Sequence, residues 1–211
     1  MKENVSFIIY SHSSYSDLWQ AFFERTQKHL GYECSEYFLF VDEVPENKKE
    51  VIPSNFEVVQ YNNDQTYPER LLTCLGKVQT ECFLFHHEDM ILFKDVDKDI
   101  FTEYVALMHS QDIDFIKLLK GGAPQDTMAD RPHKGCSSLR HTPKNAQYVV
   151  AIQPSLWNKQ SLIKLLENHK KLNIWEFEAQ VQTYCRENNY NSLYSYVGTE
   201  RKRGLFHWDS D

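Results

Sequence analysis

Two histidines and two carboxylates end an apolar run near the middle of this chain, in the order His86, His87, Glu88, Asp89. The residues before them, 82–85, are typical of a buried β-strand. Open α/β sheets bind ligands at the carboxyl ends of their strands. The cluster therefore suggests a Mg²⁺ or Mn²⁺ ion that holds a phosphorylated substrate, with Asp89 and one neighbour as ligands. A strand that simply exits into solvent is the alternative at this point.

The elements around this cluster follow the order of an α/β sheet. Strands are predicted by apolar runs at 5–10, 37–41, 56–61, 82–86, 114–119, 148–154 and 193–197. Helices are predicted by amphipathic periodicity at 17–30, 68–80, 97–111, 158–171 and 176–187. Strands that alternate with helices in this way predict a doubly wound, mostly parallel sheet flanked by helices, in a single domain of residues 1–211.

Residues 121–147 differ in composition from the rest of the chain. They hold three of the seven glycines, three of the seven prolines and several basic residues. A long segment without periodicity inside a compact domain is usually functional or disordered. The segment predicts a mobile loop that covers a substrate, with plain disorder as the alternative.

Composition limits the partners and the compartment. A net charge of −7 argues against a protein that binds nucleic acid by neutralising phosphates. The five cysteines are odd in number and contain no CxxC pair, which favours reduced thiols and a cytoplasmic location. No apolar run approaches eighteen residues, so we expect a soluble protein without a membrane span.

Several common signatures of nucleotide and hydrolase sites are missing from the sequence. It contains no GxGxxG after the first strand, no GxxxxGK[ST], no GxSxG and no HExxH. A doubly wound sheet without a glycine-rich phosphate loop needs another way to hold phosphate. A metal ion at residues 86–89 is one such way.

Five stretches together resemble the GT-A glycosyltransferases. They are Ser-His-Ser-Ser at 11–14, Pro-Glu-Arg-Leu-Leu at 68–72, Phe-Leu-Phe-His-His-Glu-Asp at 83–89, Gln-Pro-Ser-Leu-Trp at 153–157 and Trp-Glu-Phe-Glu at 175–178. The resemblance implies a GT-A-like fold with a donor-binding half at about 1–95 and an acceptor-binding half at about 96–211. It also implies a metal-dependent enzyme that moves a sugar from a UDP- or GDP-sugar to a saccharide or glycan acceptor.

The resemblance assigns the donor side. His87 stands where the family carries the first Asp of its Asp-x-Asp motif, so the role of leading metal ligand passes to Asp89. His207 is implied as a distant second ligand of the metal. Glu88 is implied to lie on the donor side. The residues implied to contact the base, ribose or diphosphate are Tyr10, Ser11, His12, Asp42 and Arg70. An ordinary turn aspartate and a solvated helix arginine are the alternatives for the last two.

The acceptor side is assigned in the same way. Trp157 and Trp175 are implied to stack on sugar rings, with core packing as the alternative. A carboxylate in a partly desolvated cleft suits a general base. Glu176 and Glu178 diverge by about 200° on a helix, so one of them faces the cleft. We favour Glu178 as the base, because it lies one turn from Trp175, and take Glu176 as the second choice.

Two other classes of function compete with this interpretation. One is a non-catalytic nucleotide-sugar-binding or scaffold protein with a degenerate metal motif, which His87 favours. The other is a nucleotidyltransferase, which the lack of a glycine-rich signature after the first strand disfavours.

Overall fold

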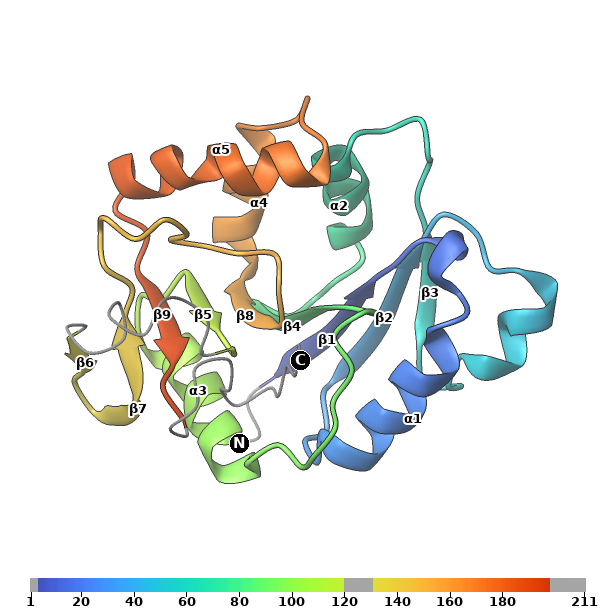
Figure 1. Ribbon diagram of the computed structural model, residues 1–211, viewed down its shortest axis with the longest axis horizontal. Coiled ribbons are helices and arrows are strands. Elements are labelled where there is room, and N and C mark those ends of the chain that lie inside the picture. Colours follow the sequence, from blue (N-terminus) through green and yellow to red (C-terminus); the bar gives the residue numbers. More distant parts are fainter. Residues whose placement is uncertain (1–3, 120–130, 198–211) are drawn as a thin grey trace.

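Nine strands form one sheet in the computed structural model, which describes residues 4–119 and 131–197 (Figure 1). The strands are β1 (Val5–Tyr10), β2 (Glu36–Val41), β3 (Glu57–Gln60), β4 (Cys82–His87), β5 (Phe115–Lys117), β6 (Pro132–His133), β7 (Cys136–His141), β8 (Ser155–Asn158) and β9 (Ser192–Ser195). The helices are α1 (Trp19–His29), α2 (Tyr67–Leu75), α3 (Lys98–Ser110), α4 (Lys159–Glu167) and α5 (Ile174–Glu187), with short 3-10 helices η1 (Ser13–Tyr15) and η2 (Glu46–Val51).

The strand order is β3-β2-β1-β4-β8-β5-β9-β7-β6. β1 pairs in parallel with β2 and β4, and β2 pairs in parallel with β3, so these four strands end at the same edge. β8 lies between β4 and β5 and runs antiparallel to both. The predicted fold class, a doubly wound and mostly parallel sheet flanked by helices, is confirmed, with β8 as a reversed strand at its centre.

Two hydrophobic cores lie on opposite faces of the sheet. One contains side chains of α1 and α3, and the other contains side chains of α2, α4 and α5; Figure 1 shows the two groups of helices on either side of the sheet. The alternation of side chains along a strand divides the two histidines of β4 between these faces. His86 packs against Phe7 and Phe22, whereas His87 packs against Tyr10 and Phe85.

The apolar run at 148–154 is not a strand, contrary to the sequence prediction. Its backbone finds partners on α5 instead, because the Gln182 side chain accepts a hydrogen bond from Val149 N at 2.7 Å and donates one to Val150 O at 2.8 Å. Val149 and Val150 are buried in the core beside α5. The strand of this region, β8, begins only at Ser155.

Part of the predicted loop at 121–147 is also regular. Within 131–147, the part of this segment that the structure describes, β6 and β7 form an antiparallel hairpin. The hairpin extends the sheet beyond β9. Gly135, with φ +94, allows the tight connection between these two strands. Short β-strands with few large apolar residues leave little periodic signal, which explains why the sequence indicated only a loop.

All five cysteines are free, as their number and spacing predicted, and all five are buried. None of the helices in the described ranges has the length and apolar character needed to cross a bilayer. The division into halves near residue 95 stays a prediction.

Trp157 belongs to the core, which corrects its assignment as an acceptor-binding residue. It is 4% exposed and its ring lies 4.5 Å from that of Phe115, on the neighbouring strand β5. Trp175 differs sharply, because 77% of it is exposed.

We expect Trp157→Ala to lower the free energy of unfolding by about 3–5 kcal/mol, because a buried indole leaves a cavity. Trp175→Ala is the matched control and should change it by less than about 0.5 kcal/mol, as exposed substitutions usually do. Urea unfolding of the two variants checks this. Similar losses in both variants would contradict the core position of Trp157.

Candidate functional site

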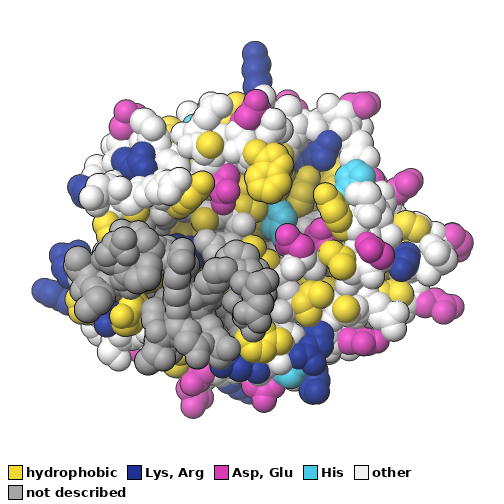
Figure 2. Space-filling view, in the orientation of Figure 1, with side chains coloured by type: hydrophobic (Ala, Val, Ile, Leu, Met, Phe, Trp, Pro, Cys, Tyr) yellow, Lys and Arg dark blue, Asp and Glu magenta, His cyan; other side chains and the backbone are white. Residues whose placement is uncertain are grey.

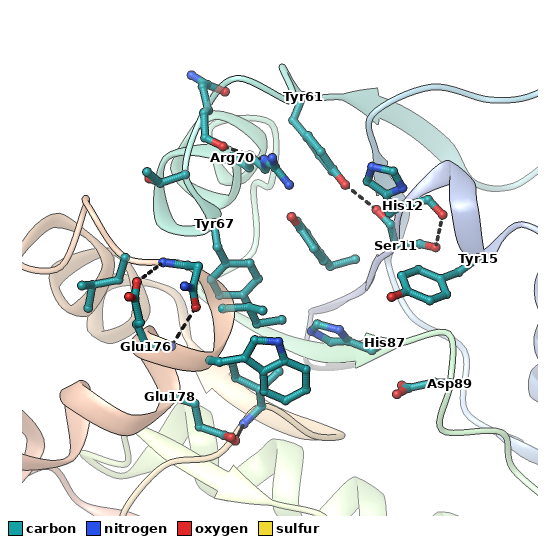
Figure 3. A pocket seen from close by; sticks show the side chains of 18 of the residues that line it. Ser11, His12, Tyr15, Tyr61, Tyr67, Arg70, His87, Asp89, Glu176 and Glu178 are labelled. Carbon is teal, nitrogen blue, oxygen red and sulfur yellow. Dashed lines mark hydrogen bonds between the residues drawn. The ribbon is translucent and has the colours of Figure 1, made fainter.

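A cavity of about 830 Å³ opens at the edge where β1 and β4 end. Figure 2 shows a hollow near the middle of this face, where hydrophobic, histidine and acidic side chains gather. Its walls come from the turn after β1, the β4 end, the first part of α2, and the segment that leads into α5 (Figure 3). The volume lies in the upper part of the range of small-molecule sites, roughly 300–1,000 Å³.

Most of the site residues predicted from the sequence line this one cavity. They are Tyr10, Ser11, His12, Arg70, Glu88, Asp89, Trp175, Glu176 and Glu178. Asp42 and Trp157 are not among the lining residues. His207 lies outside the described residues. Donor-side candidates at 10–89 and acceptor-side candidates at 175–178 are thus brought to the same place.

The side chain of Asp42 connects the turns that follow β1, β2 and β3. Its carboxylate accepts hydrogen bonds from Ser13 N at 2.7 Å, from Ser13 Oγ at 2.8 Å and from Asn63 Nδ2 at 2.9 Å, and lies 3.3 Å from His12 Nε2. Burial by itself would raise the pKa of Asp42, but the hydrogen bonds from Ser13 and Asn63 lower it overall. These contacts make Asp42 a brace of the donor wall, which corrects its assignment as a direct contact of base or ribose.

His12 is committed to the same network. Its Nδ1 accepts a hydrogen bond from Ser14 N at 3.1 Å, so in the neutral ring the proton is on Nε2, which faces Asp42. Both ring nitrogens are therefore engaged within the protein. His12 lines the cavity, but it offers ring surface to a ligand and no unused nitrogen.

An aromatic stack supports the next part of the wall. The rings of Tyr10 and Tyr61 lie parallel, 5.2 Å apart, and the guanidinium of Arg70 lies 5.1 Å from the centre of the Tyr61 ring. Arg70 also donates to Gln65 O at 2.8 Å and to Asn63 O at 2.6 Å. Arg70 therefore holds the chain between β3 and α2 in place, in addition to bringing a positive charge to the cavity wall.

Ser11 is the deepest residue of the turn after β1. It is 2% exposed, its Oγ accepts a hydrogen bond from Trp19 Nε1 at 2.8 Å, and its carbonyl accepts one from Tyr61 Oη at 2.7 Å. These bonds fix the backbone at the point where the chain leaves the sheet.

The end of β4 buries several polar groups at the base of the cavity. Burial lowers the pKa of His87 to about 3, so its ring is neutral, and its buried Nε2 has no hydrogen-bond partner among the described residues. Burial raises the pKa of Glu88 to about 7, and the neighbouring charge of Asp89 also raises it. One carboxylate oxygen of Glu88 is buried without a partner in the described part of the chain, whereas Asp89 is exposed.

This donor set fits a divalent cation that is completed by its substrate. The described residues contain no group of three or more His, Cys, Asp or Glu side chains arranged to hold an ion by themselves. Mg²⁺, however, is usually held by one or two carboxylates together with water and substrate phosphates. Asp89 and the unpartnered oxygen of Glu88 supply such a pair.

The opposite wall is built by the start of α5. The helix begins with a capping box in which the side chains of Asn173 and Glu176 each bond the other residue's backbone N–H, at 2.9 and 3.0 Å. Glu178 Oε1 accepts a hydrogen bond from Ile152 N at 2.7 Å. Glu178 is half-buried beside the cavity and Glu176 is exposed, in keeping with the preference for Glu178 as the group that faces a substrate (Figure 3).

The structure adds cavity residues that the sequence did not indicate. They are mainly Tyr15, Tyr61, Gln65, Thr66, Tyr67, Ile152 and residues 171–174. Thr66 begins α2 as the partner of Glu69 in a capping box, a pattern that is readable in the sequence. The others reach the cavity only through tertiary packing.

Comparison with known structures identifies the fold. The sequence matches no protein-family model and no curated protein sequence. The structure resembles a CMP:2-keto-3-deoxy-manno-octonic acid synthetase complexed with CTP, with a TM-score of 0.60, 12% identity, and 93% of this chain and 91% of that chain covered. It also resembles 4-diphosphocytidyl-2C-methyl-D-erythritol synthase from Anaerococcus prevotii, with a TM-score of 0.56, 12% identity, and coverage of 92% and 88%.

A cytidylyltransferase from Leptospira borgpetersenii is similar at a TM-score of 0.55 and 13% identity, with 94% of this chain and 78% of that chain covered. At these identities the likeness shows the fold alone. That fold is a single α/β domain with a large, mostly parallel sheet flanked by helices.

The brace at Asp42 gives a prediction about acid stability. Because the folded state lowers the pKa of Asp42 below its ordinary value of 3.8, the ionised carboxylate stabilises the fold above that pH, and this contribution is lost as the pH falls through the folded-state pKa. Asp42→Asn should therefore lower the free energy of unfolding by roughly 1–2 kcal/mol at pH 6. The difference from the wild type should shrink at pH 3.

Urea unfolding at the two pH values measures this difference. A gap between wild type and variant that is equally large at pH 3 and pH 6 would show that the charge of Asp42 does not carry the effect.

Proposed function

We propose that this protein is a metal-dependent glycosyltransferase that moves a sugar from a nucleoside diphosphate donor to a carbohydrate acceptor. The observation that carries the proposal is that Glu178 and the corner of His87, Glu88 and Asp89 line the same cavity from different walls. A site for sugar transfer with inversion needs an anion-binding side for the leaving diphosphate and a basic group for the acceptor.

The donor side is the corner at the end of β4 and the turn after β1. Asp89 and Glu88 would hold a Mg²⁺ or Mn²⁺ ion there, and the chemistry that this ion supplies when bound is neutralisation of charge on the diphosphate. Ser11, His12 and Tyr10 form the wall beside it. Their extensive internal hydrogen bonds and ring contacts preorganise that wall before a donor arrives.

The acceptor side is the start of α5. Glu178 accepts the proton of the acceptor hydroxyl while the bond from that oxygen to the sugar carbon forms and the bond from the sugar carbon to the diphosphate breaks. The hydrogen bond from Ile152 N fixes the carboxylate through Oε1. Trp175, exposed one turn earlier, offers a ring on which an acceptor sugar can stack.

Nucleotidyl transfer is the second candidate, since the similar structures are nucleotidyltransferases and one of them is complexed with CTP. Two observations favour sugar transfer over it. The turn after β1 is Ser-His-Ser-Ser and contains no glycine whose backbone could approach a triphosphate. Arg70 and Lys171 are the cationic side chains among the cavity residues described, and Arg70 is bonded to two backbone carbonyls.

The roles of the two carboxylates on α5 can be separated by isosteric changes. Glu178→Gln should lower the transfer rate by at least a hundredfold, the usual contribution of a general base, and leave donor affinity within about twofold. Glutamine can still accept from Ile152 N, so the fold is retained. Transfer from a panel of UDP- and GDP-sugars to mixed saccharide acceptors, and calorimetry with UDP and GDP, measure the two effects.

Glu176→Gln is the matched control, because glutamine also completes a capping box and the change should leave transfer almost unaffected. A loss of transfer in Glu176→Gln with full activity in Glu178→Gln would assign the base to Glu176. If the wild type binds a nucleotide sugar but transfers to no acceptor, the non-catalytic binding protein is the better reading. Release of pyrophosphate from CTP and a sugar would support nucleotidyl transfer.

The metal assignment predicts that donor binding depends on Mn²⁺ and on Asp89. Asp89→Asn should weaken UDP or GDP binding in the presence of Mn²⁺ by at least tenfold and should change it little when Mn²⁺ is replaced by EDTA, because the carboxylate acts through the ion. Calorimetry of both proteins under both conditions measures this. Affinity that responds to neither Mn²⁺ nor the substitution contradicts a metal at this corner.

A further inference from the structure

A pair of histidines lies on the hairpin at one end of the sheet. His133 comes from β6 and His141 from β7, and the centres of their rings are 5.3 Å apart. In the strand order, β8, β5 and β9 lie between β4 and this hairpin, and Figure 1 shows the hairpin at the opposite end of the sheet from β3. Neither histidine lines the cavity. The pair therefore lies in a different part of the molecule from the candidate sugar-transfer site.

His133 is buried without a hydrogen bond to either ring nitrogen. It is 9% exposed, and its Nδ1 and Nε2 are both shielded from solvent and have no hydrogen-bond partner in the described part of the chain. An imidazole buried in this way costs free energy, because its N–H and its lone pair both lose their hydrogen bonds to water. A phenylalanine could fill the same place without that cost. Packing alone therefore does not explain a histidine here.

The distance between the two rings fits one shared metal ion. Zn²⁺ lies about 2.0–2.1 Å from a histidine nitrogen, and that nitrogen lies about 1.1 Å from the centre of its ring. Two imidazoles bound at a tetrahedral angle then have ring centres about 5 Å apart, close to the observed 5.3 Å. A plain ring contact allows the same distance, and the unbonded nitrogens of His133 decide between the two.

Both rings are in the protonation state that a metal ion requires. Burial lowers the pKa of His133 and of His141, and the positive charge of Arg131 lowers both pKa values further. Both imidazoles are therefore neutral at pH 7, and each has a nitrogen lone pair to offer to an ion.

The surroundings of the pair select the kind of ion. Arg131 opposes any cation, and residues 131–147 contain no Asp or Glu. Mg²⁺ and Mn²⁺ prefer oxygen ligands, whereas imidazole binds Zn²⁺, Ni²⁺ and Cu²⁺ well. The described residues contain no set of three His, Cys, Asp or Glu side chains around one point, so water would complete the coordination. The nitrogen ligands therefore favour a transition-metal ion over the Mg²⁺ or Mn²⁺ of the cavity.

We propose that His133 and His141 bind one divalent transition-metal ion of the Zn²⁺ type, which links β6 to β7. This site goes beyond the proposed function and does not depend on it, because its ligands and its ion differ from those at Asp89. β6 has two residues, and β7 is its one neighbour among the described strands. An ion that joins the histidines of these two strands stabilises the hairpin at the end of the sheet.

Calorimetry of the full chain with ZnCl₂, in protein without an added histidine tag, tests the site. We expect saturable binding of Zn²⁺ that Asp89→Asn leaves within twofold. His133→Phe keeps a ring in the core and removes both nitrogens. It should weaken Zn²⁺ affinity by at least about tenfold, since even changes to groups around metal ligands cost 10–100-fold. His141→Gln should weaken it similarly, and its half-buried position makes it the second variant should His133→Phe disturb folding.

His169→Gln is the matched control, because His169 is also half-buried but its Nδ1 is bonded to Leu165 O at 2.7 Å. It should leave Zn²⁺ affinity within twofold. Saturating ZnCl₂ should raise the Tm of the wild type and of His169→Gln but not that of His133→Phe, since an ion that binds the folded state stabilises it. A wild type that binds no Zn²⁺ overturns the proposal. So does binding that survives His133→Phe and His141→Gln and is lost in Asp89→Asn, which would assign the ion to the end of β4.

Discussion

The parallel pairing of β1 with β2 on one side and β4 on the other is the constraint on which the site depends. It places Tyr10 opposite Phe40 and His87, so all three strands release the chain at one edge. The turn after β1, the brace at Asp42 and the corner at Glu88 are neighbours for that reason. β8 runs antiparallel to β4, with Ser155 opposite Phe85, so the chain before β8 also arrives at this edge. Ile152 reaches the cavity by that route.

The second half of the cavity is held to the first by side chains of α5. Glu178 and Gln182 are one turn apart, and both bind the backbone of residues 149–152. This contact supplies hydrogen-bond partners to an apolar segment that forms no strand of its own, and a buried backbone without such partners is costly. It also orients Glu178. A carboxylate held by a backbone N–H on a helix is a more precisely placed base than one on a loop.

The fold could be predicted from the sequence where the hydrophobic periodicity was strong. The site could be predicted where its residues directly follow the end of a strand. Examples are the strands β1 and β4 and the helices predicted at 97–111 and 176–187. The prediction of a strand at 148–154 failed because the hydrogen-bond partner of this segment, Gln182, lies some thirty residues further along the chain. Such a distant partner does not affect the local sequence pattern. Trp157 and Trp175 could not be told apart, because burial depends on which neighbour covers the ring.

His87 changes the charge balance of the β4 corner rather than its geometry. Burial already raises the pKa of Glu88 to about 7, and the nearby charge of Asp89 contributes to this, so two carboxylates are unfavourable neighbours there. A third carboxylate at position 87 would add to this repulsion, since like charges in a poorly solvated site oppose each other's ionisation. The neutral imidazole instead fills its place between the rings of Tyr10 and Phe85. Two carboxylates with an unpartnered oxygen still suffice for an ion whose other ligands are phosphate oxygens and water, so the histidine is compatible with a cation-dependent site.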